Sequence, residues 1–126
     1  MSRSPVRSSM APPPPGAASP GISSGRLVFV SAQLPRTLDG SPGAAGAAGQ
    51  IDLALENLAH QLRSTGLALD DIVSLEIHLV DPADQAAVDM ALEARFAPPY
   101  PALTLAGVPW LPGGARLQVA AIAQRY

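Results

Sequence analysis

A carboxylate and an imidazole lie two positions apart in the segment VSLEIHLV, residues 73–80. Because side chains alternate between the two faces of a β-strand, Glu76 and His78 point to the same face. An imidazole beside a carboxylate can exchange protons near neutral pH, as general acid–base catalysis requires. Ser31 and Gln118 are predicted to share that face, where the neutral amide can orient a water molecule but cannot deprotonate it. We take these four residues as candidate catalytic side chains; the alternative for Glu76, His78 and Gln118 is an ion pair or hydrogen bond between subunits.

The composition excludes several other kinds of site. The chain has no cysteine and no lysine, which excludes a thiolate nucleophile, cysteine-ligated zinc and a lysine Schiff base. Its two histidines are too few for a histidine-only metal site, and we expect neither a metal nor a cofactor. A formal net charge of −2, without a basic block after Arg7, argues against nucleic-acid binding. No apolar run approaches the ~20 residues that cross a bilayer, and we expect a cytoplasmic protein that binds no membrane.

Four strands and two helices are predicted to position the candidate residues. Alternation and strand-forming residues predict strands over 26–33, 73–80, 102–108 and 116–123, and helical spacing predicts helices over about 47–64 and 82–96. Gly66 is expected to end the first helix, and Asp81 to cap the second. The last two strands are predicted to form a strand–turn–strand unit. If the chain has a ligand site, its walls are expected on the face of this unit that carries Leu103, Leu105 and Gln118.

This order of elements, β, α, β, α, β, β, is typical of a small α/β (α+β) domain whose two helices cover only one face of a mixed sheet. The face against the helices is expected to include Val73, Leu75, Ile77 and Leu79. The opposite face is expected to mix Leu27, Phe29, Val80, Leu103, Leu105 and Ile122 with Ser31, Glu76, His78, Arg116 and Gln118. Such a face is too apolar for water and too polar for a sealed core, so we expect another copy of the chain to cover it.

Residues 1–24 differ in composition from the rest of the chain. They are rich in proline, serine, glycine and alanine, have few large apolar side chains, and are predicted to form a largely disordered tail before a domain at 25–126. On this view residues 1–15 are dispensable for folding. A targeting peptide is the alternative, which the prolines at 12–15 disfavour because they interrupt the amphipathic helix that such a signal needs.

Six short motifs follow one another along residues 25–124: SAQLP, ALENL, GLALDDIV, LVDPADQAAVDMALEARF, PYPALT and LQVAAIA. Together they resemble the RidA/YjgF family of reactive-intermediate (enamine/imine) deaminases. The resemblance implies a chorismate-mutase-like fold and a homotrimer with small-molecule pockets between subunits, in agreement with the uncovered sheet face.

The family's active-site positions carry other residue types here. The resemblance places the arginine that clamps the substrate carboxylate at Leu103, the cysteine two positions on at Leu105, and the last-strand glutamate that helps position water at Gln118. A helix-two asparagine falls at Asp89. A tyrosine and a glycine of the family fall at Ala18 and Ala32, whereas Ser31 and Gln33 match the family.

These departures shape the expected function. Losing the arginine clamp removes a charge-assisted pair worth ~1.5–3 kcal/mol, so imines derived from amino acids are poor candidate substrates. We expect an enzyme that acts on an imine, an enamine or a related reactive metabolite without the usual α-carboxylate. The alternative is a non-catalytic, small-ligand-binding or chaperone-like trimer; the acidic balance disfavours a ribonuclease. The candidate substrate-binding residues are Phe29, Gln33, Asp89, Leu103, Leu105 and Trp110.

Overall fold

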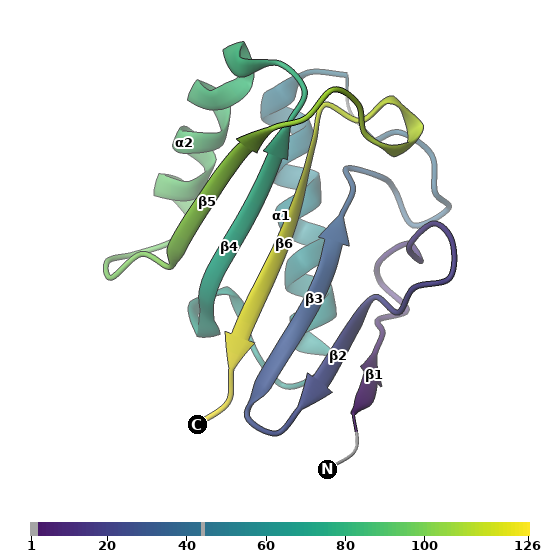
Figure 1. Cartoon of the computed structure of the whole chain (residues 1–126), viewed down its shortest axis with the longest axis vertical. Helices are drawn as coiled ribbons and strands as arrows, with labels where there is room; N and C mark the ends of the chain where they lie inside the picture. Colours follow the sequence, from purple (N-terminus) through teal and green to yellow (C-terminus); the bar gives the residue numbers. More distant parts are fainter. Residues whose placement is uncertain (1–2, 44) are drawn as a thin grey trace.

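Two helices lie on one side of a six-stranded sheet in the computed structural model, which describes residues 3–43 and 45–126 (Figure 1). The helices are α1 (Ala47–Arg63) and α2 (Gln85–Arg95). The strands are β1 (Ser4–Val6), β2 (Gly21–Ser24), β3 (Leu27–Gln33), β4 (Ile72–Leu79), β5 (Ala102–Gly107) and β6 (Leu117–Gln124). The strand order is β1-β2-β3-β6-β4-β5, and the predicted α+β class with both helices on one face is confirmed.

The core lies between the helices and the sheet. Every second residue of β6 is buried, as the alternation predicts, and α1 buries one apolar stripe against it. The fully buried side chains include Ile51, Leu55, Leu58, Leu62, Leu75, Ile77, Leu117 and Val119. Gly66, with a φ of 81°, follows the end of α1, and the Asp81 carboxylate accepts a hydrogen bond from the Ala83 N–H at 2.9 Å, as expected of a cap.

β5 and β6 follow one another across a turn, as predicted, but β4 lies between them in the sheet, so the two strands do not pair. β4 pairs in parallel with β5 and antiparallel with β6. The reason is the crossover through α2: a helix between two strands lets them pair in parallel, which places β5 beside β4 at the edge of the sheet. The chain then passes over the end of β4 before it enters β6 (Figure 1).

Two register shifts turn side chains away from the faces that simple alternation predicts. In β3 the shift lies between Val30 and Gln33, and Gln33 pairs with the buried Val119. Gln33 is therefore itself buried on the helix side, not on the uncovered face. In β4 the shift lies between Ile72 and Ser74, which buries Ile72 and leaves Val73 40% exposed. Alternation cannot anticipate an irregular residue in a ladder, because the irregularity depends on the partner strand.

The described part of the expected tail, residues 3–24, is ordered, in contrast to the prediction of disorder; residues 1 and 2 lie outside the described residues. β1 pairs with β2 and β2 with β3, so backbone hydrogen bonds order a segment that has few apolar side chains. Val6 and Ala11 are buried. Gly21 permits the close approach of the strands, since a Cβ there would lie 2.7 Å from the Phe29 carbonyl oxygen. Among the described residues, no helix has both the length and the apolar character needed to cross a membrane.

Docking of β1 predicts a stability effect at Val6. Val6→Ala removes buried apolar volume and should lower the free energy of unfolding by about 1–2 kcal/mol, measured by urea denaturation. Ser4→Ala, on the exposed part of the same strand, is the control and should change it by less than about 0.5 kcal/mol. If both variants were as stable as the parent protein, the segment would not dock, and the sequence-based view that it is dispensable would stand.

Candidate functional site

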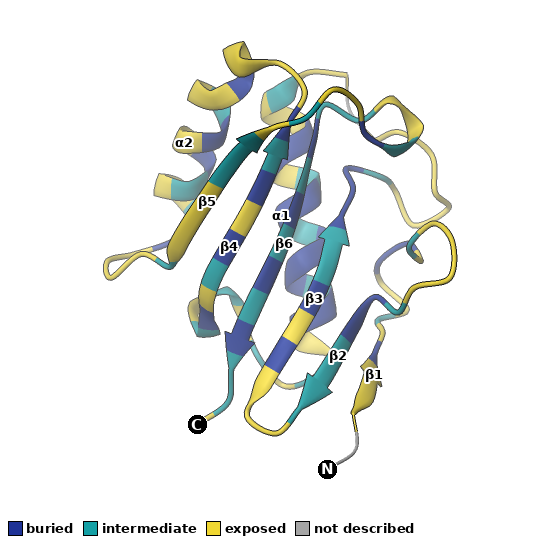
Figure 2. Ribbon diagram, viewed as in Figure 1, coloured by how far each residue is buried: buried dark blue, intermediate teal, exposed yellow. Residues whose placement is uncertain are grey.

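The uncovered face of the sheet, opposite α1 and α2, is the side turned toward the viewer in Figure 2, and exposed or half-buried residues run along β3, β4 and β5 there. Leu27 and Phe29 on β3 are 38% and 41% exposed. Phe29 lies opposite Ile122 of β6, and Ser74 lies on the other side of Ile122. Apolar side chains of β3 and β6 thus lie side by side on this face, and the polar Ser74 of β4 lies next to them.

A chain of three polar side chains crosses this apolar surface. His78 pairs with Gln118 across the β4–β6 ladder, and the Gln118 Nε2 lies 2.9 Å from the His78 Nδ1. The His78 Nε2 lies 2.9 Å from a carboxylate oxygen of Glu76. Because an amide nitrogen only donates, Nδ1 accepts, and the ring proton sits on Nε2 and is donated to Glu76. The structure therefore brings together three of the four predicted catalytic residues.

The Glu76 carboxylate, at one end of this hydrogen-bonded group, faces a shallow depression. The depression has a volume of about 220 Å³, and its lining includes Phe29, Ser74, Glu76, Ala120 and Ile122. The Glu76 side chain is 54% exposed and that of His78 23% exposed, so Glu76 meets the solvent and His78 is largely enclosed. The Glu76 carboxylate can accept a proton from a bound water, and the N–H that His78 donates to it stabilises its charged form.

Ser31, the fourth predicted catalytic residue, forms no hydrogen bond with Glu76, His78 or Gln118. Its hydroxyl donates to the Ser19 carbonyl oxygen at 2.6 Å, and its backbone N–H donates to the Pro20 carbonyl oxygen at 2.9 Å. β6 separates Ser31 on β3 from Glu76 and His78 on β4. Gln33, a predicted substrate-binding residue, donates its side-chain amide to the Ser31 carbonyl oxygen at 2.9 Å. Gln33 thus supports the irregular end of β3 and is buried away from the uncovered face.

A second group of predicted residues lies on the opposite side of the sheet. Leu103 pairs with Leu75, and Leu105 with Ile77, both of which face the helices. The expectation that Leu103 and Leu105 share a face with Gln118 is therefore wrong, because the parallel register with β4 decides where β5 points its side chains. Leu105 packs partly buried against the core, whereas Leu103 is 45% exposed.

Leu103 and Asp89 meet in a cleft between α2 and β5. This α2–β5 cleft has a volume of about 240 Å³ and is lined by Leu75, Asp89, Leu92, Glu93, Phe96, Tyr100, Pro101 and Leu103. The sequence analysis did not identify four of these residues as part of a site: Leu92, Glu93, Phe96 and Tyr100. The signal that was available is the helical spacing of Asp89, Leu92, Glu93 and Phe96, which places them on one side of α2. Trp110, also predicted to bind substrate, is 70% exposed in the loop after β5 and lines neither this cleft nor the depression at Glu76.

Arg116 is engaged on the helix side of the fold. Its Nε and Nη2 donate to the two carboxylate oxygens of Asp84, each at 2.9 Å, and its backbone N–H donates to the Gln50 side-chain oxygen. The hydrogen bonds to Asp84, together with its negative charge, raise the pKa of Arg116 above its ordinary value. The Asp84 side chain is 7% exposed, so this bidentate pair ties the start of α2 to the start of β6.

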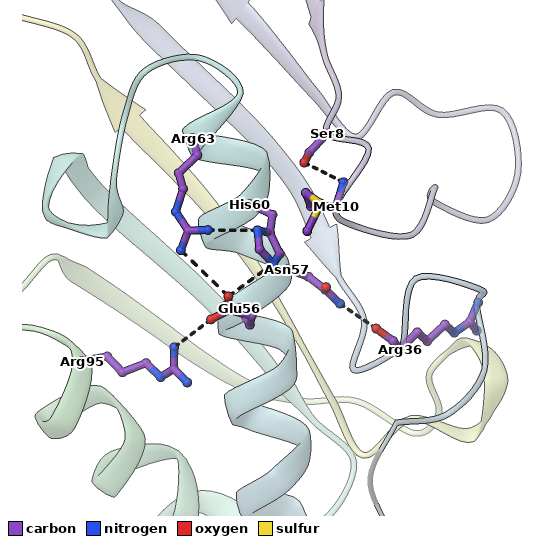
Figure 3. A network of polar contacts seen from close by, with 8 residues as sticks. All are labelled: Ser8, Met10, Arg36, Glu56, Asn57, His60, Arg63 and Arg95. Carbon is purple, nitrogen blue, oxygen red and sulfur yellow. Dashed lines mark hydrogen bonds and ion pairs between the residues drawn. The ribbon is translucent and has the colours of Figure 1, made fainter.

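Further polar contacts fasten α1 to its neighbours (Figure 3). The Glu56 carboxylate oxygens lie 3.2 Å from the His60 Nε2 and 3.6 Å from the Arg95 Nη1 of α2. The Arg63 Nη1 lies 3.0 Å from the His60 Nδ1. Asn57 donates to the carbonyl oxygens of Leu34 and Arg36, which holds the loop after β3. Over residues 3–43 and 45–126, no three or more histidine, cysteine or acidic side chains gather as a metal site.

The sequence matches the family model described as Endoribonuclease L-PSP over residues 8–125. RutC family protein YjgH of Escherichia coli is 38% identical over 97 residues, which cover 75% of this chain and 73% of that protein. The 2-iminobutanoate/2-iminopropanoate deaminase of Dermatophagoides farinae is 25% identical over 93% of this chain and 92% of its own length.

Solved structures agree with the fold throughout the chain. RidA from the Antarctic bacterium Psychrobacter has a TM-score of 0.93 at 25% identity, over 97% of this chain and 99% of that one. E. coli TdcF, solved with bound serine, has a TM-score of 0.89 at 27% identity, over 98% of this chain and 99% of that one.

The Arg116–Asp84 pair predicts a large effect on stability. Arg116→Gln leaves a buried carboxylate without its bidentate partner, so the melting temperature should fall by several degrees in a thermal scan. Arg26→Gln, at an exposed arginine, is the control and should leave it unchanged. Asp84→Asn combined with Arg116→Gln should recover part of the loss, because the buried charge is then absent. Equal melting temperatures for Arg116→Gln and the control would contradict a structural role for the pair.

Proposed function

The chain belongs to the RidA/YjgF family, and on this premise we propose that it hydrolyses an imine, an enamine or a related reactive metabolite that lacks the usual α-carboxylate. The observation that carries the proposal is the hydrogen-bonded chain of Glu76, His78 and Gln118 on the uncovered face. Deaminase activity is what the name of the Dermatophagoides relative states for that protein, and it fits a site built to handle protons and water.

A homotrimer is the second part of the proposal. The acid–base chain and the α2–β5 cleft lie on opposite sides of the sheet, so the two groups of one subunit cannot face a single ligand. Contact between the uncovered face of one subunit and the cleft edge of the next would join them into one intersubunit site. The exposed Leu27 and Phe29 on that face support an apolar contact with another copy of the chain.

The proposed reaction adds water across the C=N bond. Glu76 accepts a proton from the water as its oxygen attacks the imine carbon, and Glu76 then passes this proton to the imine nitrogen, which gives a carbinolamine. Glu76 next moves the hydroxyl proton of the carbinolamine to the nitrogen; the C–N bond breaks, ammonia leaves with the bonding pair, and a carbonyl compound remains. His78, which donates to Glu76, stabilises the carboxylate before the attack, and Gln118 holds the imidazole in the tautomer that can donate.

Substrate choice follows from the charges at the site. Leu103 occupies the position where the resemblance places the carboxylate clamp, and it contributes apolar surface to the cleft instead. Arg116 is engaged by Asp84 and does not supply the missing cation. TdcF was solved with serine, an amino acid with an α-carboxylate, but here no basic residue lines the α2–β5 cleft or the depression at Glu76. We therefore propose substrates without that group.

A non-catalytic, ligand-binding or chaperone-like trimer is the alternative. Two observations favour it. The Ser31 hydroxyl already donates its hydrogen bond to the Ser19 carbonyl oxygen, and the Gln118 side chain has no basic oxygen. The Glu76–His78 pair gives the catalytic proposal the advantage, because it supplies a base without Ser31. We propose the cytoplasm as the location of either activity. We propose no nucleic acid as partner, since the net charge is −2.

The trimer should be visible in solution. Light scattering at micromolar concentration is expected to give three times the mass of the chain. Phe29→Glu places a charge in the apolar face and should shift the protein toward monomer, whereas Leu38→Glu, at an exposed loop residue, should not. A monomer at high concentration would remove the basis for an intersubunit site.

Catalysis should depend on the Glu76 carboxylate. Ammonia release is measured from imines generated in place by an amine oxidase, with and without the protein. Glu76→Gln should lower kcat about 100-fold, the lower end of what a general base contributes. Glu56→Gln, which removes a carboxylate on the helix side, is the matched control and should retain kcat. If the parent protein gave no acceleration with any imine, the binding module would replace the enzyme.

A further inference from the structure

The α2–β5 cleft has a charge character that specifies the ligand more closely. We propose that this cleft selects a cationic, apolar ligand, the iminium ion of an oxidised amine, in place of the imine of an amino acid. This inference rests on the proposed imine hydrolysis for the reaction, but its binding step can be measured alone.

The cleft is a small apolar slot. Leu75 and Leu103 of the sheet form one wall, and Leu92 and Phe96 of the helix side form the other, with Tyr100 53% exposed at the edge. Its volume of about 240 Å³ is below the ~300–1,000 Å³ of usual ligand pockets. A compact hydrocarbon or aromatic group fits such a slot, with its polar end directed toward the rim.

The rim of this slot is negative. Asp89 and Glu93 stand one turn apart on α2, and both line the cleft. Within residues 3–43 and 45–126 neither carboxylate forms an ion pair, and no arginine or histidine lines the cleft. Like charges at this spacing repel each other, so a cation bound between them would relieve the repulsion.

Two further features of α2 favour a cation at the same place. Glu93 lies in the last turn of α2, where the partial negative charge of the helix end adds to the two carboxylates. Arg95, the basic residue of that turn, is directed to α1, where it lies 3.7 Å from Asp52 and 3.6 Å from Glu56. Arg95 therefore does not neutralise the negative potential at the cleft, and two aromatic side chains, Phe96 and Tyr100, are among the residues that line it.

This potential suits the chemistry of an iminium ion. Nearby carboxylates raise the fraction of an imine that is protonated, and the protonated form has the more electrophilic carbon. Water adds to that carbon and the C–N bond breaks, so that RCH=NH₂⁺ and H₂O give RCHO and NH₄⁺. An α-carboxylate on the same carbon would approach Asp89 and Glu93 and be repelled. The reaction that supplies such a substrate is the two-electron oxidation of a primary amine.

The test compares two ligands of similar shape and opposite charge on the full-length protein. Isothermal titration calorimetry with 2-phenylethylammonium and with 3-phenylpropanoate, at low salt, should give at least about fivefold tighter binding of the ammonium ion. The double variant Asp89→Asn/Glu93→Gln should remove this preference. Asp70→Asn, at an exposed acid outside the cleft, is the control and should keep it. Leu103→Arg should reverse the preference toward the carboxylate.

Several outcomes would overturn the inference: equal binding of the two ligands by the parent protein, tighter binding of the carboxylate, or an unchanged preference in the double variant with its fold confirmed by circular dichroism. The double variant removes the repulsion between two like charges one turn apart on α2, so it is expected to fold.

Turnover separates this inference from the proposed reaction. Binding preference for the ammonium ion without ammonia release from any imine would support the inference and overturn the hydrolase. Equal acceleration for imines with and without an α-carboxylate would support the hydrolase and overturn the inference.

Discussion

Both helices pack against the same face of the sheet, and this uneven cover divides the chain's chemistry into two parts. Glu76, His78 and Gln118 project from the uncovered face, whereas Asp89 and Leu103 line a cleft on the helix side. A sheet with its packed side chains is about 10 Å thick, so one chain cannot bring both groups to one small ligand. In the proposed trimer, a second copy of the chain would supply the other half of the site.

Burial of the uncovered face would strengthen the hydrogen bonds among Glu76, His78 and Gln118. In a solvent-exposed state the Glu76–His78 pair contributes little, because water screens the charges and competes for the hydrogen bond. When an apolar surface such as Phe29 and Ile122 is covered, the local dielectric falls and the same contacts become stronger. Assembly and acid–base function would then depend on the same surface, which links the stability of the proposed trimer to its chemistry.

The fold uses several of its arginines as ties between elements. Arg116 joins β6 to the start of α2 through Asp84, Arg95 joins α2 to α1 through Glu56, and Arg125 joins the end of β6 to Thr65 and Ser23. None of these guanidinium groups lines the α2–β5 cleft. Positive charge is thereby directed into the structure, and the cleft keeps the negative charge of its two carboxylates.

Local sequence patterns were enough to predict the two helices, the strands β3 to β6 and the common face of Glu76 and His78, because helical spacing and strand alternation act within a few residues. The docking of β1 and β2 escaped prediction, since backbone pairing orders a segment whose composition suggests disorder. The burial of Gln33 and the helix-side position of Leu103 escaped it too. Both depend on which strand lies alongside and in what register, and residues far apart in the chain determine that choice. The sequence thus determined the elements and the candidate acid–base pair, whereas only the tertiary structure decided which side chains share a cavity.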